Sequence, residues 1–94
     1  MTDIVIAAYR RSPFHFAGKG ELTKARPDEL AAQVVRALVG EAGIDPATVE
    51  DLVLGCAFPE GEQGLNAAKL IAFIAGLPES VAGTTVNRFC GSSM

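Results

Sequence analysis

Stretches that suit a buried strand alternate along this chain with stretches that suit a helix, and this alternation constrains the fold more than any other feature. A near-continuous apolar run occurs at Ile4–Tyr9 and is typical of a strand covered on both faces. Val49–Phe58 and Val81–Val86 are also predicted strands, the latter rich in β-branched residues. Between them, apolar residues recur at helical spacing in residues 27–42 and 65–75. The order β-α-β-α-β predicts an α/β layer with a mostly parallel sheet.

The first predicted helix carries its own start and stop signals. Proline followed by two acids favours a start at Pro27, and Gly43 suits a left-handed cap at the other end. Asp45-Pro46 then predicts a turn. Apolar residues at every fourth position, flanked by Ala31, Val35 and Val39, form the stripe expected to face the core: Leu30, Val34, Leu38 and Ala42.

The second predicted helix is shorter and runs from Leu65 or Asn66 to Ala75, where Gly76 and Pro78 end it. Its expected polar residue is Lys69. Its expected apolar face consists of three large side chains: Leu70, Phe73 and Ile74.

Composition excludes several classes of protein. With 94 residues, 49% of them hydrophobic and 20% charged, the chain is too apolar for a disordered segment. Its net charge of −3 disfavours nucleic acid and anionic membrane as partners. No apolar run approaches the roughly 20 residues needed to span a bilayer, and no basic region precedes the first one. We therefore expect no membrane insertion and a cytoplasmic location.

Few side chains outside the C-terminal motif suggest chemistry. Cys56 lies late in an apolar strand and is expected to fill the core, and His15 is expected on the surface of a loop. Two dispersed cysteines and one histidine cannot form a zinc site, and Gly61–Gly64 lacks a phosphate-binding pattern. The N-terminal basic residues fit a solvated loop, or alternatively a site for a phosphorylated ligand: Arg10, Arg11, Lys19, Lys24 and Arg26.

Cys90 is the strongest candidate for a catalytic residue. It directly follows a β-branched strand and precedes Gly91-Ser92-Ser93, a run that favours the start of a helix. A turn of this kind places a side chain at the carboxyl edge of the sheet, and a helix beginning at Gly91 or Ser92 would favour a thiolate. The Cys90 N–H is a candidate oxyanion donor. The alternative is that Cys90 is a small buried hydrophobe.

The octet from Asn87 to Met94 resembles the nucleophile motif of the thiolases. Further segments resemble that family in the same order along the chain: Ile4 to Phe14 with its Arg11-Ser12-Pro13 turn, Gly55-Cys56 with Glu62 to Ala68, and Ala75 to Pro78. The resemblance covers the whole chain. The sequence Cys90 to Met94 is closer to the degradative 3-ketoacyl-CoA thiolases than to the biosynthetic acetoacetyl-CoA thiolases.

The resemblance implies an acyltransferase of fatty-acid β-oxidation. Cys90 would be its nucleophile and would carry the acyl group as a thioester, and its backbone N–H would contribute to an oxyanion hole. Acyl-CoA and CoA would be the substrates, with no permanently bound cofactor and no metal. Neither His15 nor Cys56 matches the family's base histidine or second cysteine.

For the fold, the resemblance implies a layered αβαβα sandwich of two related halves. Residues 1–94 would form the opening β-α-β-α-β part of the N-terminal half, so we expect them to be inactive and unstable alone. Family members are homodimers or homotetramers, in which the strand Gly83–Asn87 would lie near the dimer interface. A further β-oxidation enzyme is an expected partner of some members.

Three other interpretations remain open. The first is an acetoacetyl-CoA thiolase of the biosynthetic type. A condensing enzyme of the ketoacyl-carrier-protein synthase type shares this fold and a nucleophilic cysteine, although the Arg11-Ser12-Pro13 turn and the residues after Cys90 favour a thiolase. A small non-catalytic α/β binding domain with a structural cysteine is the alternative from another class.

Overall fold

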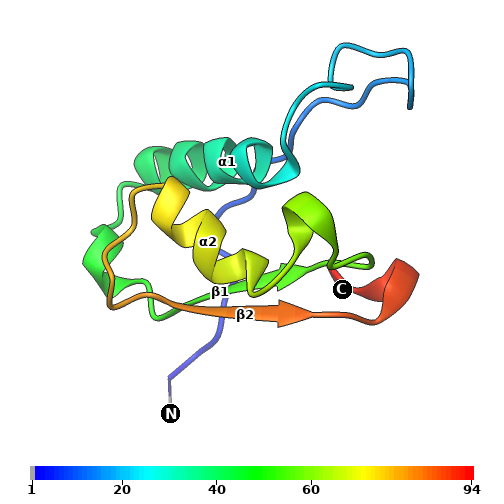
Figure 1. The fold of residues 1–94 in the computed structure, drawn as a ribbon. Coiled ribbons are helices and arrows are strands. Elements are labelled where there is room, and N and C mark those ends of the chain that lie inside the picture. The colour runs from blue at the N-terminus through cyan, green and yellow to red at the C-terminus, as the bar shows by residue number, and fades with distance from the viewer. Residues whose placement is uncertain (1) are drawn as a thin grey trace.

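The computed structural model describes residues 2–94 and places two helices on one side of a two-stranded sheet (Figure 1). The helices and strands are, in chain order, α1 (Pro27–Ala42), β1 (Asp51–Gly55), α2 (Ala67–Ile74) and β2 (Ala82–Val86). Single turns of 3-10 helix occur at Pro46–Thr48, Gly61–Gln63 and Phe89–Gly91. Within residues 2–94, no helix has the length and apolar character needed to span a membrane.

The parallel α/β arrangement predicted from the sequence is present. β1 pairs with β2 in parallel, from Asp51 opposite Ala82 to Gly55 opposite Val86. The connection between the strands is α2, whose start is fixed to β2 by polar side chains. The Thr85 hydroxyl accepts a hydrogen bond from the backbone N–H of Ala68 at 3.1 Å and donates one to Asn66 Oδ1 at 2.7 Å.

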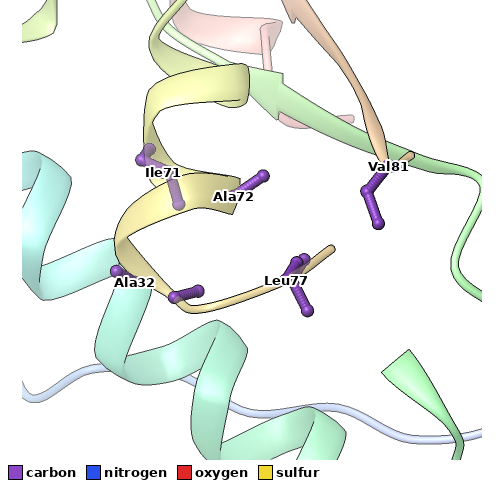
Figure 2. Close-up of a cluster of buried hydrophobic side chains, with 6 residues drawn as sticks. Ala32, Ile71, Ala72, Leu77 and Val81 are labelled. Carbon is purple, nitrogen blue, oxygen red and sulfur yellow. The ribbon is translucent and has the colours of Figure 1, made fainter. Parts of the chain in front are cut away.

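The core lies between α1, α2 and the beginning of β2, and it is built mainly from small side chains (Figure 2). Its buried members are Ala32, Ile71, Ala72, Ala75, Leu77 and Val81. Small residues allow the backbones to approach closely. A Cβ atom added at Gly83 of β2, for example, would lie 2.4 Å from the backbone nitrogen of Lys69 in α2.

The predicted apolar face of α2 is wrong. Leu70, Phe73 and Ile74 are 41%, 51% and 39% exposed, and the buried face consists of residues 67, 68, 71, 72 and 75, four of which are alanines. The helix lies against β2 through alanine side chains because larger ones would not fit the close approach at Gly83. The large residues therefore remain at its margin.

The predicted core-facing stripe of α1 is confirmed in part. Its flanking residues Ala31, Val35 and Val39 pack into the core together with Ala32, whereas Leu30 and Val34 line a shallow hollow with residues 10–13. The helix start at Pro27 and the left-handed cap at Gly43 (φ 68°) are as predicted.

The predicted strand Ile4–Tyr9 is wrong for this structure, as is the three-stranded sheet it implied. Ile4, Ile6 and Tyr9 are 94%, 93% and 82% exposed, and no backbone hydrogen bond joins residues 2–9 to β1 or β2. A strand needs the backbone of a neighbour as its partner. An apolar run supplies the side chains for a buried strand, but it cannot supply that pairing.

Candidate active site

Cys90 lies where the two strands end, on the turn that follows β2. Both strands point toward this end of the molecule, and the C-terminal turn folds back beside the end of β1 (Figure 1). Ser92 packs directly on Gly55, the last residue of β1, where an added Cβ atom would lie 2.4 Å from the Ser92 carbonyl carbon. The carboxyl edge expected from the sequence is therefore the location of Cys90.

Side-chain hydrogen bonds close the turn that carries Cys90. Asn87 Oδ1 accepts from the backbone N–H of Phe89 at 2.9 Å, and Asn87 Nδ2 donates to the carbonyl oxygen of Ala57 at 3.4 Å. Ser92 Oγ accepts from the backbone N–H of Arg88 at 2.8 Å and donates to the carbonyl oxygen of Phe89 at 2.7 Å. The turn is thus bonded both within itself and to the segment after β1.

The Cys90 thiol is free and exposed, so the alternative of a small buried hydrophobe is wrong. Cys90 lies within the 3-10 turn Phe89–Gly91, in which Gly91 N–H donates to the carbonyl of Arg88 at 3.1 Å.

Cys56 occupies a different environment and is a core residue, as predicted. It is 7% exposed, and its Sγ lies 3.7 Å from Gln63 Nε2, which also donates to the carbonyl of Phe58 at 2.8 Å. The thiol lines a cavity of about 300 Å³. The two cysteines thus differ in access, and only Cys90 is presented to solvent.

The other candidate side chains do not assemble at Cys90. His15 lies in the N-terminal loop, with Nε2 3.8 Å from Glu21 Oε2. Arg10 pairs with Glu41 of α1, and Arg11 stacks over the ring of Phe14 at 4.3 Å. Among residues 2–94, no cluster of three or more His, Cys, Asp or Glu side chains could hold a metal ion.

Arg26 joins the start of α1 to the turn Gly61–Gln63. Its Nε and Nη2 donate to the two carboxylate oxygens of Asp28 at 3.1 and 2.9 Å, and its Nη1 donates to Glu62 Oε2 at 2.9 Å. The hydrogen bond from Arg26 lowers the pKa of Asp28, which also accepts from the backbone N–H of Glu29. The pKa of Arg26 is raised by the same hydrogen bond.

Comparison with known proteins decides the family. The model of the thiolase N-terminal domain matches residues 4–94 of this chain. The chain belongs to the thiolase family. It is 45% identical over 94 residues to a 3-ketoacyl-CoA thiolase of Bacillus subtilis, 43% identical over 93 residues to one of Saccharophagus degradans and 47% identical over 92 residues to one of Acinetobacter baumannii.

These alignments include 98–100% of this chain but only 24% of each relative. The thiolase chain described here therefore spans about a quarter of the length of the curated relatives it matches. Its two parallel strands and two helices agree with part of a thiolase N-terminal domain.

The sequence indicates Cys90 but not the residues that shape its surroundings. Asn87 and Ser92 stand in the sequence as parts of the motif around Cys90, and Gly55 stands as part of a predicted strand and of a segment that resembles the thiolases. The available signal was Asn87 two residues before Phe89, because asparagine side chains commonly accept from the backbone N–H two residues on. Nothing in the sequence indicated the contact between Gly55 and Ser92.

Proposed function

We propose that this thiolase chain provides the nucleophile of a 3-ketoacyl-CoA thiolase and that Cys90 is that nucleophile. The observation that carries the proposal is the exposed Cys90 thiol on a side-chain-bonded turn at the carboxyl edge of the sheet. The relatives named 3-ketoacyl-CoA thiolase support the same activity.

The reaction is a two-step acyl transfer. The Cys90 thiolate attacks the 3-keto carbon of the substrate, the bond between C2 and C3 breaks, and acetyl-CoA leaves after its C2 carbanion takes a proton. The shortened acyl group remains on Sγ as a thioester. The thiol of a second CoA then loses its proton and attacks this thioester, which releases the shortened acyl-CoA and restores the thiolate.

The backbone N–H of Cys90 is the oxyanion donor of this proposal. Within residues 2–94 it donates to no acceptor, so it is available to the oxygen that becomes negative as Sγ attacks. A preorganised donor at that position stabilises the charge that develops in the transition state. CoA is a substrate in both steps, and the chemistry needs no permanently bound cofactor.

The proposal extends to the setting of the enzyme. Residues 1–94 form the opening part of a thiolase N-terminal domain, and the reaction serves fatty-acid β-oxidation, where a further β-oxidation enzyme is a candidate partner. A cytoplasmic location fits two free thiols, which reducing compartments preserve. Cell fractionation tests the location, and growth on fatty acids after gene deletion tests the role.

The outer edge of β2 is proposed to pair with a second copy of the chain. β2 has one neighbour in the described sheet, β1, and the segment Gly83–Asn87 carries no charged side chain of the kind that protects free edges. The proposed assembly is a homodimer, or a homotetramer made from two such dimers. Sedimentation of the full-length native protein gives the number of copies.

Peptide mass spectrometry tests the activity itself. The full-length native protein is incubated with a 3-ketoacyl-CoA in the absence of free CoA, quenched with acid and digested. We expect an acyl group on the peptide containing Cys90 and none on the peptide containing Cys56. A Cys90→Ser variant should lose both the adduct and CoA-dependent thiolysis. Acylation elsewhere, or thiolysis that survives in Cys90→Ser, would contradict the proposal.

A further inference from the structure

Phe89, the residue directly before Cys90, has a backbone conformation that its side chain disfavours. Its φ is 48°, in the left-handed region that residues with a Cβ atom rarely adopt. Its ring is 73% exposed, so packing of the side chain does not hold it there. Something else must stabilise this conformation.

The hydrogen bonds of Asn87 and Ser92 meet that requirement because they act on both sides of Phe89. Asn87 Oδ1 binds the N–H of Phe89 at 2.9 Å, and Ser92 Oγ binds its carbonyl oxygen at 2.7 Å. Ser92 Oγ also accepts from the N–H of Arg88. Strained backbone persists where its surroundings fix it in several ways, and such residues cluster at functional sites.

The same two residues attach the turn to the sheet. Asn87 Nδ2 reaches the carbonyl of Ala57, one residue beyond Cys56, while the backbone of Ser92 rests on Gly55. Cys90 therefore lies between two attachment points, one on each side of it in the sequence. A rotation of the Phe89 backbone would turn the N–H and the side chain of Cys90 together.

From this geometry we infer that Asn87 and Ser92 are positioning residues: they hold Phe89 in its left-handed conformation and thereby present the Cys90 thiol and backbone N–H to the substrate. The inference deepens the proposed function and rests on it for its catalytic meaning. Neither residue touches a reacting atom, and both act through the backbone of the turn.

The test compares the rate at which iodoacetamide alkylates Cys90 in variants of the full-length native protein, read by peptide mass spectrometry, together with kcat and KM for thiolysis. We expect Asn87→Ala and Ser92→Ala each to slow the alkylation of Cys90 by about tenfold or more and to lower kcat by a similar factor, because small misplacements of reacting groups have large effects on rate. The KM of each variant should stay within about twofold of the wild-type value. Asn87→Ser keeps an acceptor for the Phe89 N–H, so it should recover most of the loss.

A second-site variant separates positioning from general damage. Glycine adopts positive φ at little cost, so Asn87→Ala combined with Phe89→Gly should alkylate several times faster than Asn87→Ala alone. Asn66→Ala is the matched control. It also removes an asparagine side chain that is hydrogen-bonded to β2, in this case to the carbonyl oxygen of Gly83 and to the hydroxyl of Thr85. It should lower thermal stability and leave the alkylation rate of Cys90 within about twofold of wild type.

The results of these experiments separate the positioning role of Asn87 and Ser92 from the proposed role of Cys90 as the nucleophile. If wild-type Cys90 is acylated while Asn87→Ala and Ser92→Ala react at the wild-type rate, or if the double variant is no faster than Asn87→Ala, the positioning role is wrong and the proposed function stands. If wild-type Cys90 accepts no acyl group from a 3-ketoacyl-CoA, the proposed function fails, and the catalytic role of both residues fails with it.

Discussion

Gly55 is the point at which β1 contacts the turn that carries Cys90. An added Cβ atom there would lie 2.4 Å from the carbonyl carbon of Ser92 and 2.5 Å from the nitrogen of Ser93. Both are backbone atoms, so no side-chain rotation could relieve the overlap. The position of Cys90 thus depends on the absence of a single carbon atom in the neighbouring strand.

The variant Gly55→Ala tests this dependence. We expect it to displace the turn, to destabilise the full-length native protein by about 1–3 kcal/mol through overpacking, and to slow alkylation of Cys90. Urea denaturation and the alkylation assay measure the two effects.

Gly40→Ala is the matched control for that variant. Gly40 lies inside α1, and an added Cβ atom there would meet no other atom within 4 Å. Because alanine is the better helix former, this change should stabilise the protein by about 0.5–1 kcal/mol and leave Cys90 unaffected. Equal alkylation rates in Gly55→Ala and Gly40→Ala would contradict the contact with Ser92.

At the scale of elements, Arg26 links the N-terminus of α1 to the Gly61–Gln63 turn through Asp28 and Glu62. The carboxylate of Asp28 is bound in its charged form, so its pKa lies below the ordinary value of 3.8. The carboxyl group of Asp28 therefore binds its proton more tightly in the unfolded chain than in the folded chain. The resulting stability is fully present above the ordinary pKa and is lost as the pH falls through the lowered one.

Substitution Asp28→Asn should therefore destabilise the protein most near neutral pH. The difference in unfolding free energy between wild type and variant should shrink as the pH falls from about 5 toward about 2. Thermal or urea unfolding of both proteins across that range measures it. A difference for Asp28→Asn that stays constant down to low pH would refute the linkage.

The elements most accurately predicted from the sequence are those specified by local chemistry. Pro27, Gly43 and Gly76 indicate helix ends because each affects only the backbone of the neighbouring helical turn. In the structure α1 begins at Pro27 and is capped by Gly43, and α2 ends shortly before Gly76. The faces of those helices were predicted less well. Which face is buried depends on contacts such as Gly83 with Lys69, which join residues distant in the sequence.

The candidate site likewise has one part that a local sequence pattern predicts and another that depends on contacts between distant residues. The strand followed by Cys90 and small residues is a local pattern, so the sequence indicated both Cys90, the proposed nucleophile, and the edge of the sheet at which it lies. The hydrogen bond from Asn87 to Ala57 and the packing of Ser92 on Gly55 span 30 residues or more. No pattern in a single sequence specifies such pairs. The apolar run at Ile4–Tyr9 failed for the related reason that a strand also needs a partner.

At the scale of the whole molecule, the chain exposes more surface than a self-contained domain of its size. Its accessible surface is 7263 Å², whereas a folded monomer of 9.8 kDa exposes about 5200 Å². Val81 is the one large side chain among the described residues that is completely buried. The small core formed by α1, α2 and the start of β2, half of whose buried members are alanines, therefore buries little apolar area for a chain of this length.

We accordingly expect residues 1–94, expressed alone, to lack a cooperative thermal transition. The apolar side chains at Ile4, Ile6, Phe14 and Phe16 are each at least 80% exposed, and exposed surface of this kind binds hydrophobic dyes. Calorimetry should show no sharp heat-absorption peak, and anilinonaphthalene sulfonate should fluoresce strongly with the isolated segment and weakly with the full-length native protein. The excess surface of about 2000 Å² on this one chain is larger than the roughly 800 Å² that each partner buries in a standard protein interface, so contacts outside these residues would be needed to cover it. A sharp calorimetric transition without dye binding would instead establish that the small α1–α2 core suffices by itself.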